Sequence, residues 1–446
     1  MTQHPVAFTI VPAPTGRHLP VEATLDNCIK CNICVTVCPV AAVTDRFPGP
    51  KYEGPQAGRF RGGNQPAPDA SVDYCSGCRM CNMACPTGVK IAEINARARA
   101  RLVEQGEVGK RHRVRNNLLA RPATLSRVGA PVGPMVNALF ANRVARWAAE
   151  KMLGIHRRAP LPRYAGERFS RWLRRWSPTG ERRAGKVAYF TGCSAEHYEP
   201  RVARMAVQVL DRLGIEVVVP DQGCCGLPLL SNGEFHAARA YHQANVDRLV
   251  GFARDGIPIV GASTSCTLTL KEEAPELLDA MDEEDRLVAA ATFDIHEFLV
   301  LLAEDGRFPD DLRPVPLRLL YHPPCQYRAH RLGLPALDMM ELVPGLEVVA
   351  SEAACCGVAG TYGYKEEKYD IAMAVGQPLF DRVAAVGGPV AVCDAETCRW
   401  QIEHGTGVPA IHPIEIIAYA LGLDAEGPLA EAIAGAAHGD LPPSDS

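Results

Sequence analysis

The segment Cys28-Ile29-Lys30-Cys31-Asn32-Ile33-Cys34-Val35-Thr36-Val37-Cys38-Pro39 decides how the first part of this chain folds. A second copy of its C-x2-C-x2-C-x3-C-P spacing ends at Pro86 and contains Cys75, Cys78, Cys81 and Cys85. Thiolates are soft ligands, and the two-residue spacing makes a tight loop in which three sulfur atoms converge on one cubane cluster. The two motifs therefore predict an α-rich, ferredoxin-like domain with two [4Fe-4S] clusters.

The fourth cysteine of each motif precedes a proline, and in two-cluster ferredoxins this cysteine binds the other cluster. We therefore expect one cluster on Cys28, Cys31, Cys34 and Cys85, and the other on Cys75, Cys78, Cys81 and Cys38. Structural zinc usually takes two separated pairs of ligands, and disulfides suit small secreted domains. Neither alternative explains a third cysteine at the same spacing followed by Cys-Pro.

The length and composition indicate a multidomain protein of a reducing compartment. A chain of 446 residues is too long for one hydrophobic core. Its 17 cysteines are too few for a disulfide scaffold but many for a cytosolic enzyme. The segment Met1 to Leu25 has no signal-peptide pattern, and the sequence has no apolar run of about 18 residues that would predict a transmembrane helix.

Changes in composition along the chain predict five segments. They are a ferredoxin-like domain (1–106), a basic helical linker (107–185), two cysteine-rich repeats (186–312 and 313–425) and a disordered tail (426–446). Residues 44–70 are dense in Gly, Pro and charge, which predicts a long surface loop between the two motifs. The Ala-rich stretch from Ile91 to Glu104 predicts a helix that leaves the cluster domain.

Residues 97–186 are strongly basic, with 22 Lys and Arg against 5 Asp and Glu. On a helix, four apolar residues of this segment would share one face: Phe169, Trp172, Leu173 and Trp176. Such a face beside basic residues is typical of a helix in the headgroup layer of an anionic membrane. The alternative is a linker whose aromatic side chains pack on a neighbouring domain or subunit. No recognised motif indicates nucleic acid binding.

From Lys186 onward the sequence repeats itself. The first half contains Cys193, Cys224, Cys225 and Cys266, and the second contains Cys325, Cys355, Cys356 and Cys398. The intervals around the Cys-Cys-Gly sequence are 31 and 41 residues in the first half and 30 and 42 in the second. Two matching long intervals indicate an internal duplication.

Each half alternates short apolar runs with longer helical patterns, which predicts a duplicated α/β domain with a largely parallel sheet. The runs are 187–190, 257–260, 317–321 and 390–392, and helices are predicted at 202–213 and 366–386. The eight repeat cysteines then follow the C-terminal ends of strands, where open α/β sheets bind ligands. They are candidate ligands of one or two further iron–sulfur clusters.

Other residues near these cysteines have a simpler interpretation. Cys393 has no counterpart in the first half and is interpreted as a buried strand residue. His197, Tyr198 and His322 lie beside candidate ligands, and packing or support of the ligands is the favoured role for them. The sequence assigns no catalytic residue.

The Cys-Cys-Gly repeats resemble the cysteine-rich domain of heterodisulfide reductase subunits and many iron–sulfur oxidoreductases. Taken with the ferredoxin motifs, several stretches most resemble the family of the C subunits of anaerobic glycerol-3-phosphate dehydrogenases, from about Cys28 to Leu423. These stretches are Asn27–Cys31, Phe47–Lys51, Ala262–Cys266, Cys355–Gly363 and Glu396–Gln401.

The resemblance implies an electron-transfer subunit of an oxidoreductase used in anaerobic respiration. In that family a flavin-containing subunit oxidises glycerol 3-phosphate, and the C subunit passes the electrons to membrane quinone as a peripheral protein, here expected on the cytoplasmic face of the inner membrane. No G-x-G-x-x-G follows a predicted strand, so flavin is expected on another chain. The alternatives are a glycolate- or lactate-type dehydrogenase subunit and a thiol–disulfide oxidoreductase similar to heterodisulfide reductase.

The sequence departs from this family at one point in each repeat. The repeat domain commonly ends in Cys-x-x-Cys, but the first position of that pair is Ser263 in one half and Ala395 in the other. Each half therefore offers four aligned thiols, which suffice for a cubane cluster. The five-cysteine, non-cubane cluster of heterodisulfide reductases is not predicted here.

Overall fold

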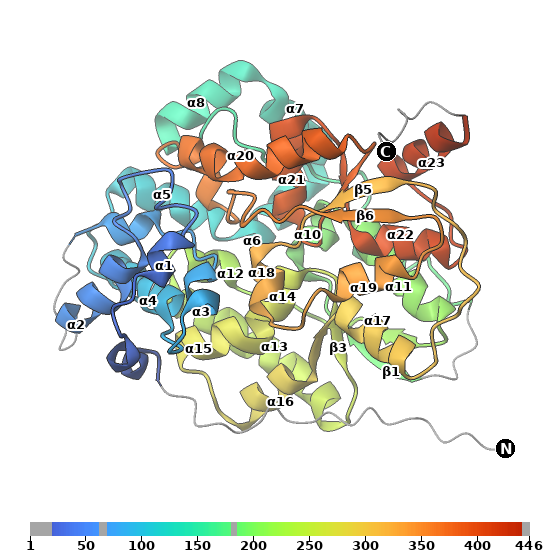
Figure 1. The fold of residues 1–446 in the computed structure, drawn as a ribbon, viewed down its shortest axis with the longest axis horizontal. Helices are drawn as coiled ribbons and strands as arrows, with labels where there is room; N and C mark the ends of the chain where they lie inside the picture. Colours follow the sequence, from blue (N-terminus) through green and yellow to red (C-terminus); the bar gives the residue numbers. More distant parts are fainter. Residues whose placement is uncertain (1–19, 62–68, 180–184, 439–446) are drawn as a thin grey trace.

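The computed structural model describes residues 20–61, 69–179 and 185–438. Figure 1 shows the N-terminal cluster domain lying beside two α/β repeats, with helices α7 and α8 projecting at the top. None of the described helices combines the length and apolarity needed to cross a bilayer. The predicted multidomain architecture, α-rich first and duplicated α/β second, is confirmed.

The two ferredoxin motifs form the same local structure twice. A 3-10 helix precedes each motif (Val21–Asn27 and Ser71–Tyr74), and a short α-helix holds its third cysteine (α1, Ile33–Thr36; α3, Met80–Ala84). The residues before α1 and α3 have left-handed backbones, with φ of 68° at Asn32 and 60° at Arg79. These turns fold each cysteine loop back on itself. Helix α4 (Ile91–Glu104) follows, as predicted.

The prediction of a surface loop at residues 44–70 is wrong for the central part of this segment. A π-helical turn (Tyr52–Gln56) continues into α2 (Ala57–Arg61), while residues 62–68 lie outside the described part of the chain. Glycine permits this packing, because a Cβ at Gly54 would lie 2.7 Å from Ile91 Cγ2. A buried ion pair of 2.9 Å between Arg61 and Glu53 closes the turn.

The basic linker is helical. It contains α5 (Lys110–Leu119), α6 (Pro122–Gly129), a 3-10 turn (Ala130–Val132), α7 (Gly133–Ala141), α8 (Arg143–Leu153) and α9 (Phe169–Leu173). Pro122 and Pro134 stand in the first turns of α6 and α7, where proline costs no hydrogen bond. The Asn142 side chain caps α8 by accepting from the N–H groups of Val144 and Ala145.

Each repeat contains a four-stranded parallel sheet of the same topology. The orders are β2-β1-β3-β4 and β6-β5-β7-β8, so each strand of the first sheet has a counterpart in the second. The strands are β1 (Lys186–Tyr189), β2 (Glu216–Val218), β3 (Ile259–Gly261), β4 (Thr292–Asp294), β5 (Arg318–Tyr321), β6 (Glu347–Ala350), β7 (Ala391–Val392) and β8 (Ala410–Ile411). This topology confirms the duplication that the cysteine intervals predict.

Helices flank both sheets. Those of the first repeat are α10 (Gly192–His197), α11 (Pro200–Arg212), α12 (Leu227–Ser231), α13 (Phe235–Arg254), α14 (Thr264–Leu268), α15 (Ala274–Leu278), α16 (Glu283–Ala291) and α17 (Ile295–Glu304). A π-helical turn (Thr269–Glu273) joins α14 to α15. Those of the second repeat are α18 (Cys325–Ala329), α19 (Pro335–Glu341), α20 (Tyr369–Val386), α21 (Glu396–Thr406) and α22 (Pro413–Ala420), with a 3-10 turn at Tyr362–Tyr364.

The tail predicted as disordered is helical over most of its length. Helix α23 (Gly427–His438) buries Leu429 and Ala432 in the core that the two repeats share. The Ala-rich sequence favours a helix, and burial of one apolar side supplies the stabilisation that local composition did not indicate. Residues 439–446 lie outside the described part of the chain.

Candidate metal centres

The first set of ferredoxin cysteines surrounds a small cavity. Cys28, Cys31, Cys34 and Cys85 line it together, so the last cysteine of the second motif lies with the first three of the first. Burial and the three neighbouring thiols raise the pKa of Cys34. At Cys85 burial acts in the same direction, but hydrogen bonds from Thr87 and the Val89 N–H outweigh it and lower the pKa. Donors to sulfur of this kind suit a thiolate that binds iron.

In the second set, the last cysteine of the first motif lies with the first three of the second motif. Cys38, from the first motif, lines a cavity with Cys75, Cys78 and Cys81. Its sulfur accepts from the Ala41 N–H at 3.4 Å, and Cys75 Sγ lies 3.6 Å from Asn95 Nδ2. Hydrogen bonds to sulfur tune the reduction potential of a bound cluster. The structure thus brings together both four-thiol sets expected from the spacing.

The repeat cysteines also converge within each half. In the first, Cys193 stands at the start of α10 and its Sγ lies 3.8 Å from that of Cys224. Hydrogen bonding to Cys224 and Cys266, together with burial, raises the pKa of Cys225, so all four thiols are neighbours. They follow β1, β2 and β3, at the C-terminal edge of the sheet, where the sequence places them.

The second half repeats this arrangement. Cys325 begins α18, the Cys355-Cys356 pair follows β6, and Cys398 lies in α21 after β7. The sulfur atoms of Cys356 and Cys398 are 2.9 Å apart. The Gly357 N–H donates to Cys355 Sγ at 3.3 Å, so the glycine of the Cys-Cys-Gly sequence turns its backbone toward the thiols.

A central cavity of about 270 Å³ joins these sets. The N-terminal domain, the linker and both repeats all contribute to its wall. Eight of the lining residues are cysteines: Cys78, Cys193, Cys225, Cys266, Cys325, Cys355, Cys356 and Cys398. Cys78 also packs in one buried cluster with Cys325 and Cys355. The second ferredoxin set is therefore next to the thiols of the second repeat.

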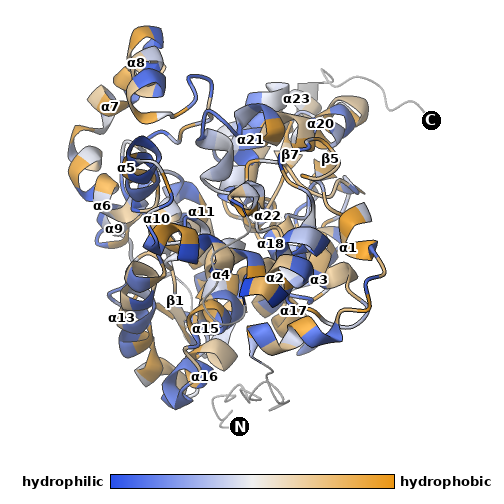
Figure 2. Cartoon of the chain, turned by 90° about the vertical axis from the view of Figure 1, so that its left-hand side faces the viewer, coloured by the Kyte–Doolittle hydropathy of each residue, from blue (hydrophilic) through white to orange (hydrophobic). Residues whose placement is uncertain are grey.

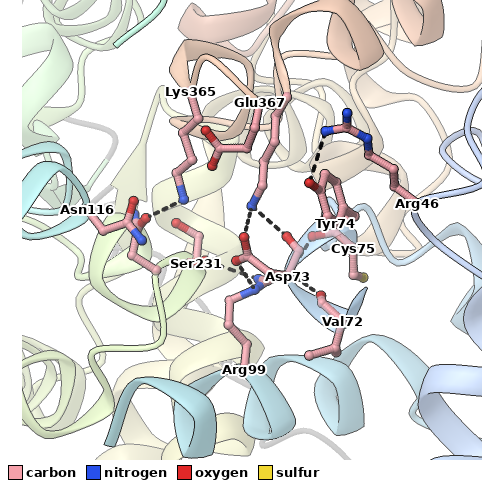
Figure 3. A network of polar contacts seen from close by, with 12 residues as sticks. Arg46, Val72, Asp73, Tyr74, Cys75, Arg99, Asn116, Ser231, Lys365 and Glu367 are labelled. Atoms are coloured by element: carbon pink, nitrogen blue, oxygen red, sulfur yellow. Dashed lines mark hydrogen bonds and ion pairs between the residues drawn. The ribbon is translucent and has the colours of Figure 1, made fainter. Parts of the chain in front are cut away.

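A charged network holds the second ferredoxin motif against the second repeat (Figure 3). The buried Lys368 ammonium donates to the Asp73 carbonyl at 2.6 Å and to its carboxylate. Arg99 donates to the carbonyl oxygens of Val72 and Cys75. Burial opposes ionisation of Asp73, but the charges of Lys368, Lys365 and Arg99 hold the pKa of this carboxyl well below its ordinary value. The network ends beside Cys75 and fixes one wall of the second set.

The aromatic residues predicted to touch a membrane pack on the protein instead. Phe169 is buried in the core of the repeats, and Trp172, Leu173 and Trp176 are partly buried against it. The three aromatic rings stack in series, with centroids 5.7 Å apart for Phe169 and Trp172 and 5.5 Å for Trp172 and Trp176. Since these side chains cover the core, this face is not a membrane surface, and the alternative of packing on a neighbouring domain describes it.

The remaining residues considered in the sequence have defined surroundings. Cys393 is fully buried directly after β7, and Cys356 first and Cys393 second contribute to the raised pKa of Cys398. His322 Nδ1 lies 2.8 Å from Ser351 Oγ, and burial lowers the pKa of His322 to about 4. Burial likewise lowers the pKa of His197 to about 4. Both imidazoles are therefore neutral at physiological pH.

Sequence reasoning missed most of the cavity wall. Tyr164, Tyr364 and Trp400 line it, with Tyr198 between Tyr164 and Trp400 at ring-centroid distances of 5.2 and 6.0 Å. These residues come from the linker and from both repeats. No local pattern connects them, so only the assembled fold shows that they share a site.

Comparisons with known proteins agree with this architecture. Residues 24–89 match the 4Fe-4S dicluster domain family, and residues 187–271 and 319–403 match the cysteine-rich domain family. The chain is 36% identical over 406 residues to the C subunit of anaerobic glycerol-3-phosphate dehydrogenase from Escherichia coli (strain K12), which covers 90% of this chain and 99% of that protein.

Two other relatives match part of the chain. The B subunit of fumarate reductase (CoM/CoB) from Methanothermobacter marburgensis is 28% identical over 228 residues, 50% of this chain and 43% of its own length. Lactate utilization protein A of Geobacillus thermodenitrificans is 33% identical over 189 residues, 40% of this chain and 75% of its own length.

The domain matches and the gathered thiols show an iron–sulfur protein with multiple [4Fe-4S] clusters and an electron-transfer role in an oxidoreductase. The near full-length match shows more: this chain belongs to the family of the C subunits of anaerobic glycerol-3-phosphate dehydrogenases.

Proposed function

We propose that this chain carries electrons from a flavin-containing subunit of an anaerobic glycerol-3-phosphate dehydrogenase to quinone. The observation that supports this role best is the contact between Cys78 of the second ferredoxin set and the Cys325 and Cys355 thiols of the second repeat. The thiol sets lie side by side from the N-terminal domain into the repeats. Such a row suits electron transfer between successive clusters.

The proposed ligands follow the four sets. The clusters of the N-terminal domain are held by Cys28, Cys31, Cys34 and Cys85 and by Cys75, Cys78, Cys81 and Cys38. One or two further clusters are held by Cys193, Cys224, Cys225 and Cys266 and by Cys325, Cys355, Cys356 and Cys398. When bound, the clusters supply one-electron redox chemistry. The protein holds the thiolates, excludes water from most of them and donates hydrogen bonds to sulfur.

A paired substitution tests the role of the repeats. Replacing Cys224 and Cys225 by Ser should abolish quinone reduction while dithionite still reduces both ferredoxin-type clusters, as followed by anaerobic EPR. Unchanged EPR signals of both ferredoxin-type clusters are the control that the double variant is folded. Unchanged quinone reduction in the double variant would refute the proposed path.

The electron donor is tested separately. Glycerol 3-phosphate, added anaerobically to native membranes that contain the tagged protein, should reduce its clusters, whereas lactate and glycolate should not. The partial match to lactate utilization protein A makes lactate the informative alternative. Reduction by lactate alone would assign the chain to a lactate-type dehydrogenase. Reduction by none of the three would favour a thiol–disulfide substrate. We do not expect this outcome, because Ser263 and Ala395 stand where the repeat domain commonly has a further thiol.

We also propose that α6 to α8 form the surface that contacts an anionic membrane. Figure 2 shows α7 and α8 standing away from the rest of the molecule, with hydrophobic and hydrophilic residues along them. Eight large apolar side chains are exposed on this segment: Leu125, Val128, Val132, Met135, Leu139, Val144, Trp147 and Met152. Such a concentration of exposed apolar residues is unusual for a surface that faces only water.

The charge of the same segment indicates that its partner is an anionic surface. Between residues 122 and 163, the exposed charged side chains are all basic: Arg127, Arg143, Lys151, Arg157, Arg158 and Arg163. Glu150, the acidic residue of this range, is buried and paired with Arg157. Apolar side chains inserted between lipid headgroups, with arginine and lysine on anionic lipid, match this composition.

Vesicle binding tests the surface. Met135→Ser, Leu139→Ser and Trp147→Ser combined should reduce co-sedimentation with phosphatidylglycerol-rich vesicles at least tenfold, because three inserted side chains are lost. Leu301→Ser with Leu342→Ser, which changes exposed apolar residues elsewhere, should have no effect. Equal binding of the triple variant would exclude α7 and α8 as the contact.

A further inference from the structure

One end of the central cavity is built from aromatic and apolar side chains. Tyr164, Tyr198 and Trp400 form a continuous series of rings, and Leu125, Phe140 and Leu161 complete the wall. We call these six residues the aromatic wall. It contains no charged side chain, and it comes from α6, α7, the segment after α8, α21 and the C-cap of α10. It therefore suits a flat, uncharged ligand.

Buried hydrogen-bonding groups without a protein partner face the same cavity. Tyr364 is 5% exposed, and its hydroxyl has no partner among the described residues. The same holds for the hydroxyl of Ser194, which is 7% exposed. Both residues line the cavity. Both hydroxyls are therefore available to donate hydrogen bonds to a ligand that binds in this cavity.

Tyr198 of the aromatic wall and the neighbouring Tyr364 lie near the cysteine sets of different repeats. Tyr198 is close enough to Cys193 for the two groups to affect each other electrostatically, and Tyr364 is similarly close to Cys356. A ligand at this end of the cavity would lie near one thiol set of each half. This is where an electron acceptor served by both repeats would bind.

The wall is only one helix layer away from the proposed membrane surface. Leu125 on α6 lines the cavity and is 41% exposed, and on α7 Phe140 lines the cavity while its neighbour Leu139 is exposed. A lipophilic ligand in the bilayer would therefore meet the outer side of the same two helices. No other group of described surface residues combines this apolar exposure with a position beside the cavity.

From these observations we infer that the central cavity binds the headgroup of a quinone against the aromatic wall, with Tyr364 and Ser194 donating hydrogen bonds to its carbonyl oxygens. This inference rests on the proposed function, because it assigns the place where the proposed electron acceptor binds. A quinone is flat, uncharged and lipophilic, and its two carbonyl oxygens accept hydrogen bonds, so each property has a counterpart in the cavity.

A charged disulfide substrate fits the same end less well. The arginine residues that line the cavity are already neutralised: Arg79 pairs with Glu93 at 3.1 Å and with Glu272 at 2.8 Å, and Arg99 lies 3.5 Å from Asp73. They belong to the N-terminal domain and not to the aromatic wall. Carboxylate groups of a substrate would thus find no free cation there.

Photoaffinity labelling of the anaerobic holoprotein tests the site directly. An azidoquinone with a short isoprenoid tail should label peptides that contain 119–140, 161–164 or 396–400, and excess decylquinone should prevent this labelling. Leu125→Trp fills the wall and should reduce the labelling at least fivefold. Leu301→Trp makes the same exchange at an exposed position of α17 and should leave it unchanged.

Kinetics test the hydrogen bond. Tyr364→Phe should raise the KM for decylquinone about fivefold and leave the rate with ferricyanide unchanged, because only one donor is lost. Tyr362→Phe is the matched control, since it removes another buried hydroxyl without a described partner from a residue that does not line the cavity. Cluster EPR signals should be the same in all four variants, which excludes loss of folding as the cause.

The outcomes separate the site from the function. The first requirement is that decylquinone reoxidises the dithionite-reduced wild-type protein. If it does, labelling of other peptides or an unchanged KM in Tyr364→Phe would refute the proposed quinone site, while the proposed function would stand. If decylquinone fails to reoxidise the wild-type clusters, the proposed function and the site are both refuted.

Discussion

At the scale of single residues, Arg399 shows how the two repeats are joined. Its guanidinium is buried and donates to the carbonyl oxygens of Cys393 and Asp394 at 2.6 and 2.8 Å. It also donates to the carboxylate of Glu199, which belongs to the first repeat. The planar guanidinium can satisfy all these acceptors at once, which a lysine cannot. One side chain therefore fixes the loop before α21 and its contact with the other half.

Arg399→Met should destabilise the protein by about 3 to 5 kcal/mol, because it leaves Glu199 and two buried carbonyl groups without their partner. Anaerobic urea unfolding followed by circular dichroism measures this loss. Arg318→Met is the control, since Arg318 is 42% exposed and pairs with the exposed Glu347. That change should cost at most about 1 kcal/mol. Similar losses in the two variants would contradict the role given to Arg399.

The contrast with the cysteines explains what sequence reasoning can reach at this scale. Cys28, Cys75 and their partners follow a spacing dictated by cluster geometry, so their spatial sets could be predicted residue by residue. Arg399 stands in a stretch whose resemblance to a family could be recognised, but nothing near it indicates Glu199, 200 positions away. The sequence likewise gives no indication of the role of Tyr364, because only the fold shows that its hydroxyl has no partner.

At the scale of elements, the glycine of each Cys-Cys-Gly sequence makes the turn that follows the paired thiols. Both glycines have left-handed backbones, with φ of +93° at Gly226 and +88° at Gly357. At Gly357 a Cβ would lie 1.9 Å from the carbonyl oxygen of Ala372 in α20, a distance that no side chain tolerates. At Gly226 the nearest atom is 3.6 Å away. The second repeat therefore needs this glycine for packing as well as for conformation.

Gly357→Ala should move α20 away from the thiols, lower the free energy of unfolding by about 3 kcal/mol and reduce the iron content of the second repeat. Iron analysis and anaerobic urea unfolding measure the two effects. Gly407→Ala is the control, because Gly407 has a φ of +74° with open space around it. It should cost only about 1 kcal/mol and no iron. Full iron content in Gly357→Ala would show that the loop adapts.

Helix α9 shows where element-level prediction stops. The periodicity of Phe169, Trp172, Leu173 and Trp176 correctly indicates an apolar face, but a pattern does not reveal what covers that face. In the fold the core of the repeats covers it. The face that remains uncovered lies on α6 to α8, where Met135 and Trp147 are exposed. Exposure depends on the arrangement of distant elements, which local sequence does not encode.

At the scale of the whole molecule, the cysteine intervals predict the duplication and the alternation of apolar runs with helical patterns predicts the parallel sheets. Neither pattern predicts how the two halves meet. The halves meet through buried polar groups. His296, at the start of α17 in the first repeat, lies 3.3 Å from Asp394 of the second and stacks on His412 with a centroid distance of 5.3 Å. His412 accepts from the Ile414 N–H and donates to Ala262 O of the first repeat, so it is neutral.

The charge of His296 makes this junction sensitive to pH. Burial acts against the protonated form, but the carboxylates of Asp294 and Asp394, which lie 3.7 and 3.3 Å from His296 Nδ1, outweigh it and raise the pKa of His296 to about 9 from an ordinary 6.5. Tyr321 donates to Asp394 at 2.8 Å and supports the carboxylate. A raised pKa in the folded state stabilises the protein fully below pH 6.5, and this stabilisation is lost as the pH rises through about 9.

His296→Gln should therefore be less stable than the wild type by about 3 kcal/mol at pH 6, and this difference should shrink toward zero as the pH rises above 9. Anaerobic urea unfolding of both proteins between pH 6 and 10 measures it, and the comparison cancels the lysines, tyrosines and thiols that titrate in the same range. Two curves that stay parallel across this range would show that His296 is not protonated in the fold, and that the repeats are held together by packing and by Arg399 instead.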